Sequence, residues 1–300
     1  MNSSFTKCLK SSRFAAMGTL LMIIGSSTSD AGMIIHSGDL LTVSTDNKLR
    51  SYSLAGTGTL VQTLQITGLG LELTPTGTAQ GVSVLNSQLF IGLVSTNASF
   101  TPKIVEVDPE TGAAINIFDT ATPQITALGD DGTNLLLLDS VNTWDVYTYT
   151  TGGNFVSEVA MTRHTLSNFQ MEGIDGDGSS IFMSANLGYQ PIQINDTAGN
   201  LLSFFNTNVP TDSIRGLAYD PNDATLWVAS GGNFHQFSQA GVALSTVTPG
   251  LGSSSVTGLE VISPSQQVVP EPGTLASLLS LVLFGTGAVF VRNRRAKQIS

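Results

Sequence analysis

Ile214-Arg215-Gly216-Leu217-Ala218-Tyr219 is one of five copies of a short pattern in the middle of the chain. Each copy has an apolar residue, a polar residue, Gly or Ala, and then a β-rich run. The other copies are Ala79–Val84, Ile125–Leu128, Met171–Ile174 and Val256–Val261. From one small residue to the next, the copies are 46, 46, 43 and 42 residues apart. A regular period of this length is typical of repeat architectures.

Turn residues and further apolar runs lie between the copies. Asp220-Pro221-Asn222-Asp223 leads into a second apolar run, and a third run ends at a turn such as Asp196-Thr197-Ala198-Gly199. Glycine supplies positive φ at such turns, and aspartate caps its own turn through the carboxylate. Short alternating runs separated by turns indicate antiparallel strands. No stretch between residues 33 and 268 has a convincing helical pattern.

Four strands in about 45 residues make one blade of a β-propeller. The first unit, which begins near Leu40, lacks the repeated pattern, and the last copy at Val256–Ile262 lacks the rest of its unit. Pairing these two ends would close the ring and remove an exposed sheet edge. The sequence therefore predicts an all-β, five-bladed propeller within residues 32–263, closed by its N- and C-terminal strands. A two-sheet sandwich is the alternative.

Composition and charge exclude several classes of protein. The chain has 300 residues, only 11% of them charged, a formal net charge of −10 and one cysteine. One cysteine excludes a disulfide framework and a cysteine-based zinc site. The acidic balance argues against nucleic acid as a partner, because phosphate binding needs clustered Lys and Arg. Of the 12 basic residues, three lie in the first 13 positions and four in the last nine.

Residues 1–31 have the pattern of a cleavable secretory signal peptide. A basic stretch precedes the largely apolar run Phe14–Gly25, and small residues follow at Ser29 and Ala31. The apolar run is shorter than the roughly 20 residues that cross a bilayer as a helix. We therefore predict export, with cleavage after Ala31.

The C-terminal end has the pattern of a membrane anchor. Residues 273–291 carry no charge and are long enough to span a bilayer as one helix. The basic tail 292–300 follows, with Arg292, Arg294, Arg295 and Lys297, and is predicted to stay in the cytoplasm. The preceding linker, 264–272, ends in Pro270-Glu271-Pro272, where two prolines favour an extended, accessible backbone.

The Pro-Glu-Pro motif, the apolar helix and the basic cluster together resemble the PEP-CTERM sorting signal, over residues 269–297. The resemblance implies a bacterial protein exported by a species that makes exopolysaccharide. It also implies that exosortase, a membrane-embedded cysteine protease, processes the Pro-Glu-Pro region. The expected partners are signal peptidase, an exosortase-like protease, and a glycan or exopolysaccharide. The expected location is the inner membrane, with the domain on the periplasmic side, and then the cell surface or extracellular space.

The propeller prediction brings five polar residues together. They directly precede the small residue of each repeated pattern: Gln80, Thr126, Glu172, Arg215 and Thr257. If the repeated strand is innermost, these side chains form a polar ring in the central channel. The ring either holds an ion pair between Glu172 and Arg215 with water, or forms a small-ligand or cation site. Some gluconolactonase-like propellers hold a metal in this channel, but only Glu172 is similar to their ligands, so we do not carry over that activity.

No other motif predicts chemistry. Asp175-Gly176-Asp177-Gly178 and Asp130-Asp131 begin like calcium loops but lack the later bidentate glutamate, so we expect them to stabilise hairpin turns. The three histidines, His36, His164 and His235, have no metal-ligand spacing and no glycine-framed serine beside them. We expect no catalytic residues, metal or cofactor.

The sequence thus predicts an exported, C-terminally sorted surface or extracellular-matrix protein. Its propeller would have a non-enzymatic binding or structural role linked to exopolysaccharide or the envelope. The alternative is a periplasmic or extracellular propeller hydrolase or lyase that uses the central channel.

Overall fold

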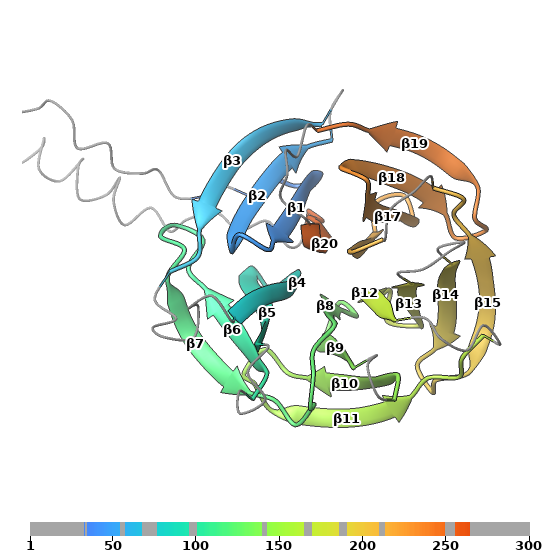
Figure 1. Cartoon of the computed structure of the whole chain (residues 1–300), viewed down its shortest axis with the longest axis horizontal. Helices are drawn as coiled ribbons and strands as arrows, with labels where there is room; N and C mark the ends of the chain where they lie inside the picture. The colour runs from blue at the N-terminus through green and yellow to red at the C-terminus, as the bar shows by residue number, and fades with distance from the viewer. Residues whose placement is uncertain are drawn as a thin grey trace, which may run out of the picture. The chain divides into compact units, whose positions relative to one another are not determined.

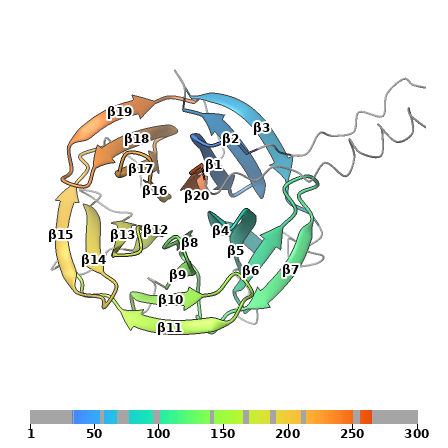
Figure 2. The same cartoon turned by 180° about the vertical axis from the view of Figure 1, so that it is seen from behind.

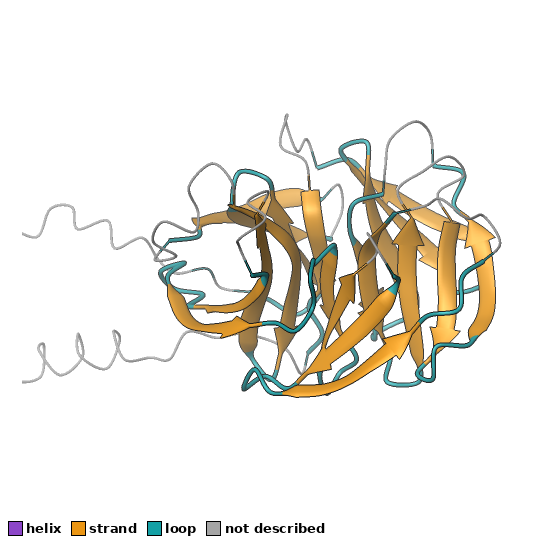
Figure 3. Ribbon diagram, turned by 60° about the horizontal axis from the view of Figure 1, so that its bottom comes forward, coloured by secondary structure: helices purple, strands orange, loops and turns teal. Residues whose placement is uncertain are grey.

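A computed structural model describes residues 33, 35–54, 58–67, 77–95, 101–139, 143–164, 170–185, 191–209, 214–249 and 256–264. Every regular element in these ranges is a β-strand (Figure 3). The strands form five antiparallel four-stranded sheets. The described ranges contain no apolar helix of membrane-spanning length. The predicted signal peptide, Pro-Glu-Pro motif, membrane helix and basic tail lie outside the described residues.

The five sheets are the blades of a propeller, arranged around a central channel (Figures 1 and 2). Blade 1 contains β20 (Val256–Val261), β1 (Asp39–Ser44), β2 (Lys48–Ser53) and β3 (Thr59–Gln65). Blade 2 contains β4 (Gly77–Leu85), β5 (Gln88–Ser95), β6 (Lys103–Val107) and β7 (Ala114–Asp119). Blade 3 contains β8 (Ala127–Asp130), β9 (Leu135–Asp139), β10 (Asp145–Tyr149) and β11 (Phe155–Ala160). Blade 4 contains β12 (Met171–Gly176), β13 (Ser180–Ala185), β14 (Pro191–Asp196) and β15 (Leu201–Asn206). Blade 5 contains β16 (Leu217–Asp220), β17 (Thr225–Ser230), β18 (Asn233–Ser238) and β19 (Ala243–Val247).

Blade 1 closes the ring in the predicted way. Strand β20, from the end of the domain, pairs antiparallel with β1, from its beginning, in a register that sets Leu40 opposite Val261 and Leu41 opposite Glu260. The innermost strand of this blade therefore comes from the other end of the chain. The five-bladed propeller is confirmed, and the sandwich alternative is wrong.

The core lies between the blades. Adjacent blades bury clusters of aliphatic and aromatic residues against each other, and the cluster between blades 1 and 2 includes Leu41, Val43, Val82 and Val84. A similar cluster joins blade 5 to blade 1. The central strand of a blade is therefore covered on both faces, which explains continuous apolar runs such as Leu135–Leu138.

The small residue of the repeated pattern is required by close approach of the innermost strands. A Cβ atom on Gly258 of blade 1 would collide with the backbone of Gly81 in blade 2. A Cβ on Gly81 would collide with the backbone of Leu128 in blade 3. Side chains are excluded at these contacts, so the five-fold recurrence of Gly or Ala reports how tightly the strands pack around the channel.

Candidate functional site

In three of the blades, the polar residue of the repeated pattern lies in a β-bulge of the innermost strand. In blade 4, Met171 pairs with Ala185 and Gly173 with Ser184, which leaves Glu172 as the extra residue. The same irregularity includes Gln80 in β4 and Thr257 in β20. Bulges re-aim a side chain without ending the strand.

The structure places all five predicted ring residues around one cavity. This cavity, of about 70 Å³, is lined by Gln80, Thr126, Glu172, Arg215 and Thr257 together with four neighbours. Arg215 Nε lies 3.7 Å from Glu172 Oε2, and the Arg215 side chain is 44% exposed. An ion pair that exposed contributes at most about 1 kcal/mol to stability.

A larger cavity lies further along the same strands. Three residues that line it, Asp130, Asp175 and Glu260, follow the ring residues of their own repeats by three or four positions. This spacing is roughly 10 Å along a strand. The volume of the cavity is about 290 Å³, and it opens among the turns that join the first and second strands of the blades. It is lined by Leu85, Asn86, Asp130, Asp131, Gly132, Asp175, Gly176, Asp177, Tyr219, Pro221, Glu260 and Ser263. Five carboxylates and no basic side chain therefore line this cavity.

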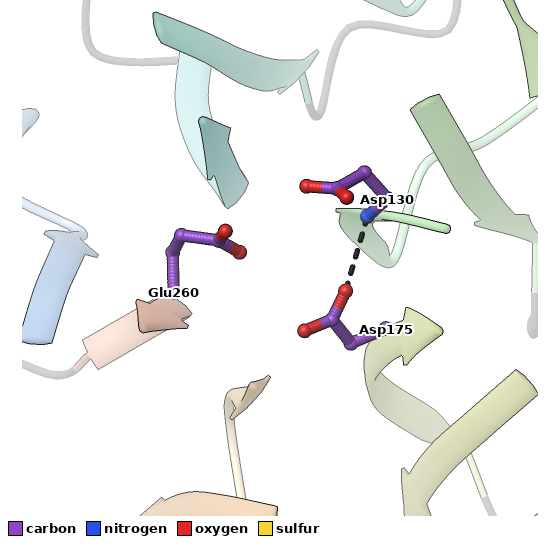
Figure 4. A group of neighbouring side chains, drawn as sticks. All are labelled: Asp130, Asp175 and Glu260. Atoms are coloured by element: carbon purple, nitrogen blue, oxygen red, sulfur yellow. Dashed lines mark hydrogen bonds between the residues drawn. The ribbon is translucent and has the colours of Figure 1, made fainter. Parts of the chain in front are cut away.

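Three of these carboxylates converge on one point (Figure 4). Asp130 comes from β8, Asp175 from β12 and Glu260 from β20, so three blades contribute one acid each. One oxygen from each residue lies within 4.8 Å of the others. The three residues are only 3–4% exposed. We call Asp130, Asp175 and Glu260 the acidic cluster.

Hydrogen bonds between blades hold two members of the cluster in place. Ser83 Oγ, from blade 2, donates a 2.8 Å hydrogen bond to Asp130 Oδ2. The backbone N–H of Asp130 donates to Asp175 Oδ1 at 3.2 Å, and that of Tyr219 donates to Asp175 Oδ2 at 2.6 Å. Gly176 also donates to Asp175 Oδ1. These bonds run from blade 2 to blade 5 around the channel.

Burial makes ionisation of Asp130 and Asp175 unfavourable. It raises the pKa of Asp130 to about 6, against the lowering effect of hydrogen bonds from Ser83 and Gly132. Burial and the charge of Asp130 together raise the pKa of Asp175 well above its usual value, although three backbone N–H groups oppose the shift. At neutral pH the cluster therefore needs a positive charge, which a proton or a bound cation can supply.

The donor set fits a hard divalent cation. Ca²⁺ takes carboxylate and carbonyl oxygens at about 2.3–2.6 Å, so two of its ligands are at most about 5 Å apart. The span of the cluster is within this limit. Mg²⁺ needs oxygens at about 2.0–2.1 Å, which the present span fits less well. Zn²⁺ and copper favour nitrogen and sulfur donors, and the lining contains no His or Cys.

The cluster differs from what the sequence predicts. The turn assignment of Asp175 is wrong, because this residue lies in β12 and faces the channel, while Asp177 caps the turn through Ser179 and Ser180. Asp130 does cap its turn, by accepting from Gly132, and also reaches the channel. The expectation of no metal stays a prediction, and Glu260 was not among the site residues predicted from the sequence. The available signal was an acid three or four positions after the ring residue in three of the five copies.

The histidines lie elsewhere. His235 is on β18, the third strand of blade 5, where its Nδ1 lies 3.1 Å from Thr246 Oγ1. The ring of His164 packs against Phe204, and the backbone N–H of His36 donates to Asp39. None of them lines either of the two cavities described here.

Comparisons with known proteins identify no family. No family model matches the chain, and no curated protein matches it. Among solved structures, the chain is similar to a chain of the "Crystal Structure of Mitotic Checkpoint Complex", with a TM-score of 0.40 and 14% identity. The match covers 74% of this chain and 64% of the other, less than two thirds of its length. Nothing about function follows from a likeness of this level.

Proposed function

We propose that the chain is an exported, C-terminally sorted surface or extracellular-matrix protein whose propeller binds a divalent cation, with Ca²⁺ as the favoured ion. The role is binding and structural rather than catalytic, and is linked to the envelope or exopolysaccharide. The converging carboxylates of Asp130, Asp175 and Glu260 are the observation that carries the binding proposal.

Export and sorting are supported by the sequence. The signal-peptide pattern occupies residues 1–31, before the propeller domain. The Pro270-Glu271-Pro272 motif, the apolar stretch and the basic tail follow the domain. The predicted mature domain contains no cysteine, since the only cysteine, Cys8, precedes the predicted cleavage point. These features suit a domain that works outside the cytoplasm.

Cation binding is supported by charge balance. The acidic cluster is buried, and no basic side chain lines its cavity. A cation relieves the repulsion between the carboxylates, and it is available at millimolar concentration to a protein outside the cell. Extracellular calcium modules bind with dissociation constants of roughly 0.1–1 mM, and we expect a value in this range.

A channel hydrolase or lyase is the second candidate. The same cation would supply Lewis-acid chemistry, and Glu172 or the acidic cluster would supply a base. An activity screen separates the two proposals. The enzyme proposal would replace the binding proposal if the protein turns over a polysaccharide or lactone. That activity must be lost in Glu172→Gln or Glu260→Gln while the fold stays intact.

Mass measurement of the protein purified from its producing cell tests export and sorting. We expect a mature form that starts near Gly32 and ends within residues 270–272. A form that keeps residues 273–300 would mean that the C-terminal stretch is a plain anchor, and the sorting proposal would be wrong.

Calorimetric titration with CaCl₂ tests cation binding. We expect one Ca²⁺ per chain, and loss of this binding in Glu260→Gln. Glu158→Gln is the matched control, because it removes one carboxylate from the exposed strand β11 and leaves the channel unchanged. No heat of binding in the wild-type protein, or equal binding in Glu260→Gln, would contradict the proposal.

A further inference from the structure

The chain enters and leaves the propeller at the same place. Strand β20 ends with Val261 opposite Leu40, near the start of β1. Just beyond these strands, the N–H of Gly38 donates to the carbonyl of Ile262 at 2.8 Å, and the N–H of Ile262 donates to the carbonyl of Asp39 at 3.0 Å. Strands β20 and β1 are the two strands of blade 1 nearest the channel (Figure 1). Both connections to the domain are therefore beside the channel and not at the circumference.

The exit point lies at the mouth of the larger cavity. Thr257, near the start of β20, lines the smaller cavity, and Glu260, near its end, lines the larger one. Ser263, two residues beyond the strand, also lines the larger cavity, and Pro264 after it is exposed. We call the end of the propeller with the acidic cluster the exit face, and the opposite end, with the smaller cavity, the ring face.

The linker to the predicted membrane helix is short. Residues 265–272 separate Pro264 from the apolar stretch that begins at 273. Eight residues span at most about 29 Å when fully extended. The position of any membrane relative to the propeller is therefore restricted.

The linker cannot bring the ring face against a membrane. It would have to cross the width of blade 1 from its innermost strand and then follow the height of β3. Four strands are roughly 14 Å wide and the seven residues of β3 are roughly 23 Å long, so this path is roughly 37 Å and exceeds the reach of the linker. The channel gives no shorter path, because it narrows to a cavity of about 70 Å³ at the ring residues.

We propose that the exit face is the membrane-facing surface of the anchored protein, and that the ring face points away from the membrane. This inference rests on the C-terminal anchoring of the proposed function. The negative charge of the exit face is compatible with this orientation, because the linker can hold it further from the lipid headgroups than the Debye length of about 8 Å at physiological salt.

The orientation gives the two mouths of the channel different access. In the anchored protein, a large partner such as the proposed exopolysaccharide meets the ring face, with Gln80, Glu172 and Arg215 around its cavity. The acidic cluster opens toward the membrane, where ions and small solutes can still reach it. Cleavage within residues 270–272 then frees the exit face.

Energy transfer from the protein to labelled lipid tests the orientation. Thr133 and Thr143 are a matched pair, because both are exposed and lie in turns at opposite ends of β9 in blade 3. Thr133 is at the exit face, in the turn that begins with Asp131, and Thr143 is at the ring face. Each is replaced by cysteine in the full chain carrying Cys8→Ser and labelled with a fluorescent donor. The chains are then reconstituted into phosphatidylcholine vesicles that contain a rhodamine headgroup lipid.

We expect at least twofold more energy transfer from Thr133→Cys than from Thr143→Cys. If Thr133→Cys fails to fold, Ser179→Cys replaces it, because Ser179 is exposed in the corresponding turn of blade 4. The same labelled chains ending at residue 272 are the control, and should show no transfer from either position.

Vesicle flotation separates this inference from the proposal on which it rests. A full chain that floats but shows equal transfer from both positions, or more from Thr143→Cys, would overturn the orientation and leave the anchor intact. A full chain that does not float with the vesicles has no membrane anchor, and both proposals would then be wrong.

Discussion

The backbone N–H of Tyr219 donates a 2.6 Å hydrogen bond to Asp175 Oδ2 across the boundary between blades 5 and 4. The same carboxylate accepts the N–H of Asp130 from blade 3. One buried acid therefore ties three blades together at the channel, where Glu260 of blade 1 approaches it. These hydrogen bonds offset part of the cost of burying the Asp175 carboxylate. They also hold the carboxylate where the cluster can bind a cation.

Asp175→Asn should destabilise the metal-free protein. An amide cannot accept hydrogen bonds at both ends, so at least one of the N–H groups of Asp130, Gly176 and Tyr219 loses its acceptor. A buried donor left without an acceptor costs about 1–3 kcal/mol. Denaturant unfolding in the presence of a chelator measures this loss, with Glu158→Gln as control. An unfolding free energy equal to that of the wild type would show that the hydrogen bonds do not hold the cluster.

The metal-free protein should lose stability as pH rises from about 4 to 6. The folded-state pKa of Asp130 is about 6, above the usual 3.8, so the folded state holds more protons than the unfolded state in this window. The stabilising proton is fully present below pH 4 and is lost as pH passes 6, with an effect of the order of 3 kcal/mol. Asp131, Asp175, Asp177 and Glu260 face the same cavity, and burial also raises the pKa of Asp175.

Ca²⁺ should remove this pH dependence, because the cation replaces the proton. Denaturant unfolding at several pH values, with CaCl₂ or with a chelator, makes the comparison. The binding reaction should release protons near pH 6, and the apparent affinity should fall at pH 5. An affinity that is the same at pH 5 and pH 7 would be inconsistent with binding at these carboxylates.

Gly258→Ala should be strongly destabilising. The added methyl group would collide with the backbone of Gly81, where blades 1 and 2 meet at the channel. Overpacking of this kind costs about 1–3 kcal/mol or more, since backbone must shift. The control is Gly152→Ala, whose Cβ would meet its nearest neighbours at ordinary distances of 3.6 and 3.7 Å. Thermal unfolding of the two variants makes the comparison, and equal melting temperatures would refute the packing argument.

Arg215→Gln should change the unfolding free energy by less than about 1 kcal/mol, because the ion pair with Glu172 is long and its arginine is 44% exposed. Ca²⁺ binding should be unchanged, since Arg215 lines the smaller cavity and not the one with the acidic cluster. Calorimetry on this variant checks both the separation of the two cavities and the location of the cation. A large change in Ca²⁺ affinity would place the cation at the ring instead.

The propeller could be predicted from sequence because its geometry repeats. The innermost strands approach too closely for side chains at Gly81 and Gly258, so a small residue recurs at a fixed period. Ring closure followed from an incomplete unit at each end, which β1 and β20 complete by pairing. Close packing in a repeated frame leaves a periodic signal, and a periodic signal can be found in one sequence.

The acidic cluster could not be predicted in the same way. Its members come from three blades and are distant in sequence, and blades 2 and 5 contribute Ser83 and a backbone N–H instead of an acid. The sequence Asp175-Gly176-Asp177-Gly178 also resembles a turn, although strand β12 continues through Asp175 to Gly176. The direction of the Asp175 side chain depends on the bulge at Glu172, because a bulge changes which residues of a strand face the channel.

A crystal structure of the protein grown with CaCl₂ would test the central claim most directly, through the anomalous signal of the metal. We predict one peak between Asp130, Asp175 and Glu260, at about 2.3–2.6 Å from an oxygen of each carboxylate. An empty cluster in crystals that contain Ca²⁺, or a peak only at some other place in the chain, would contradict the account.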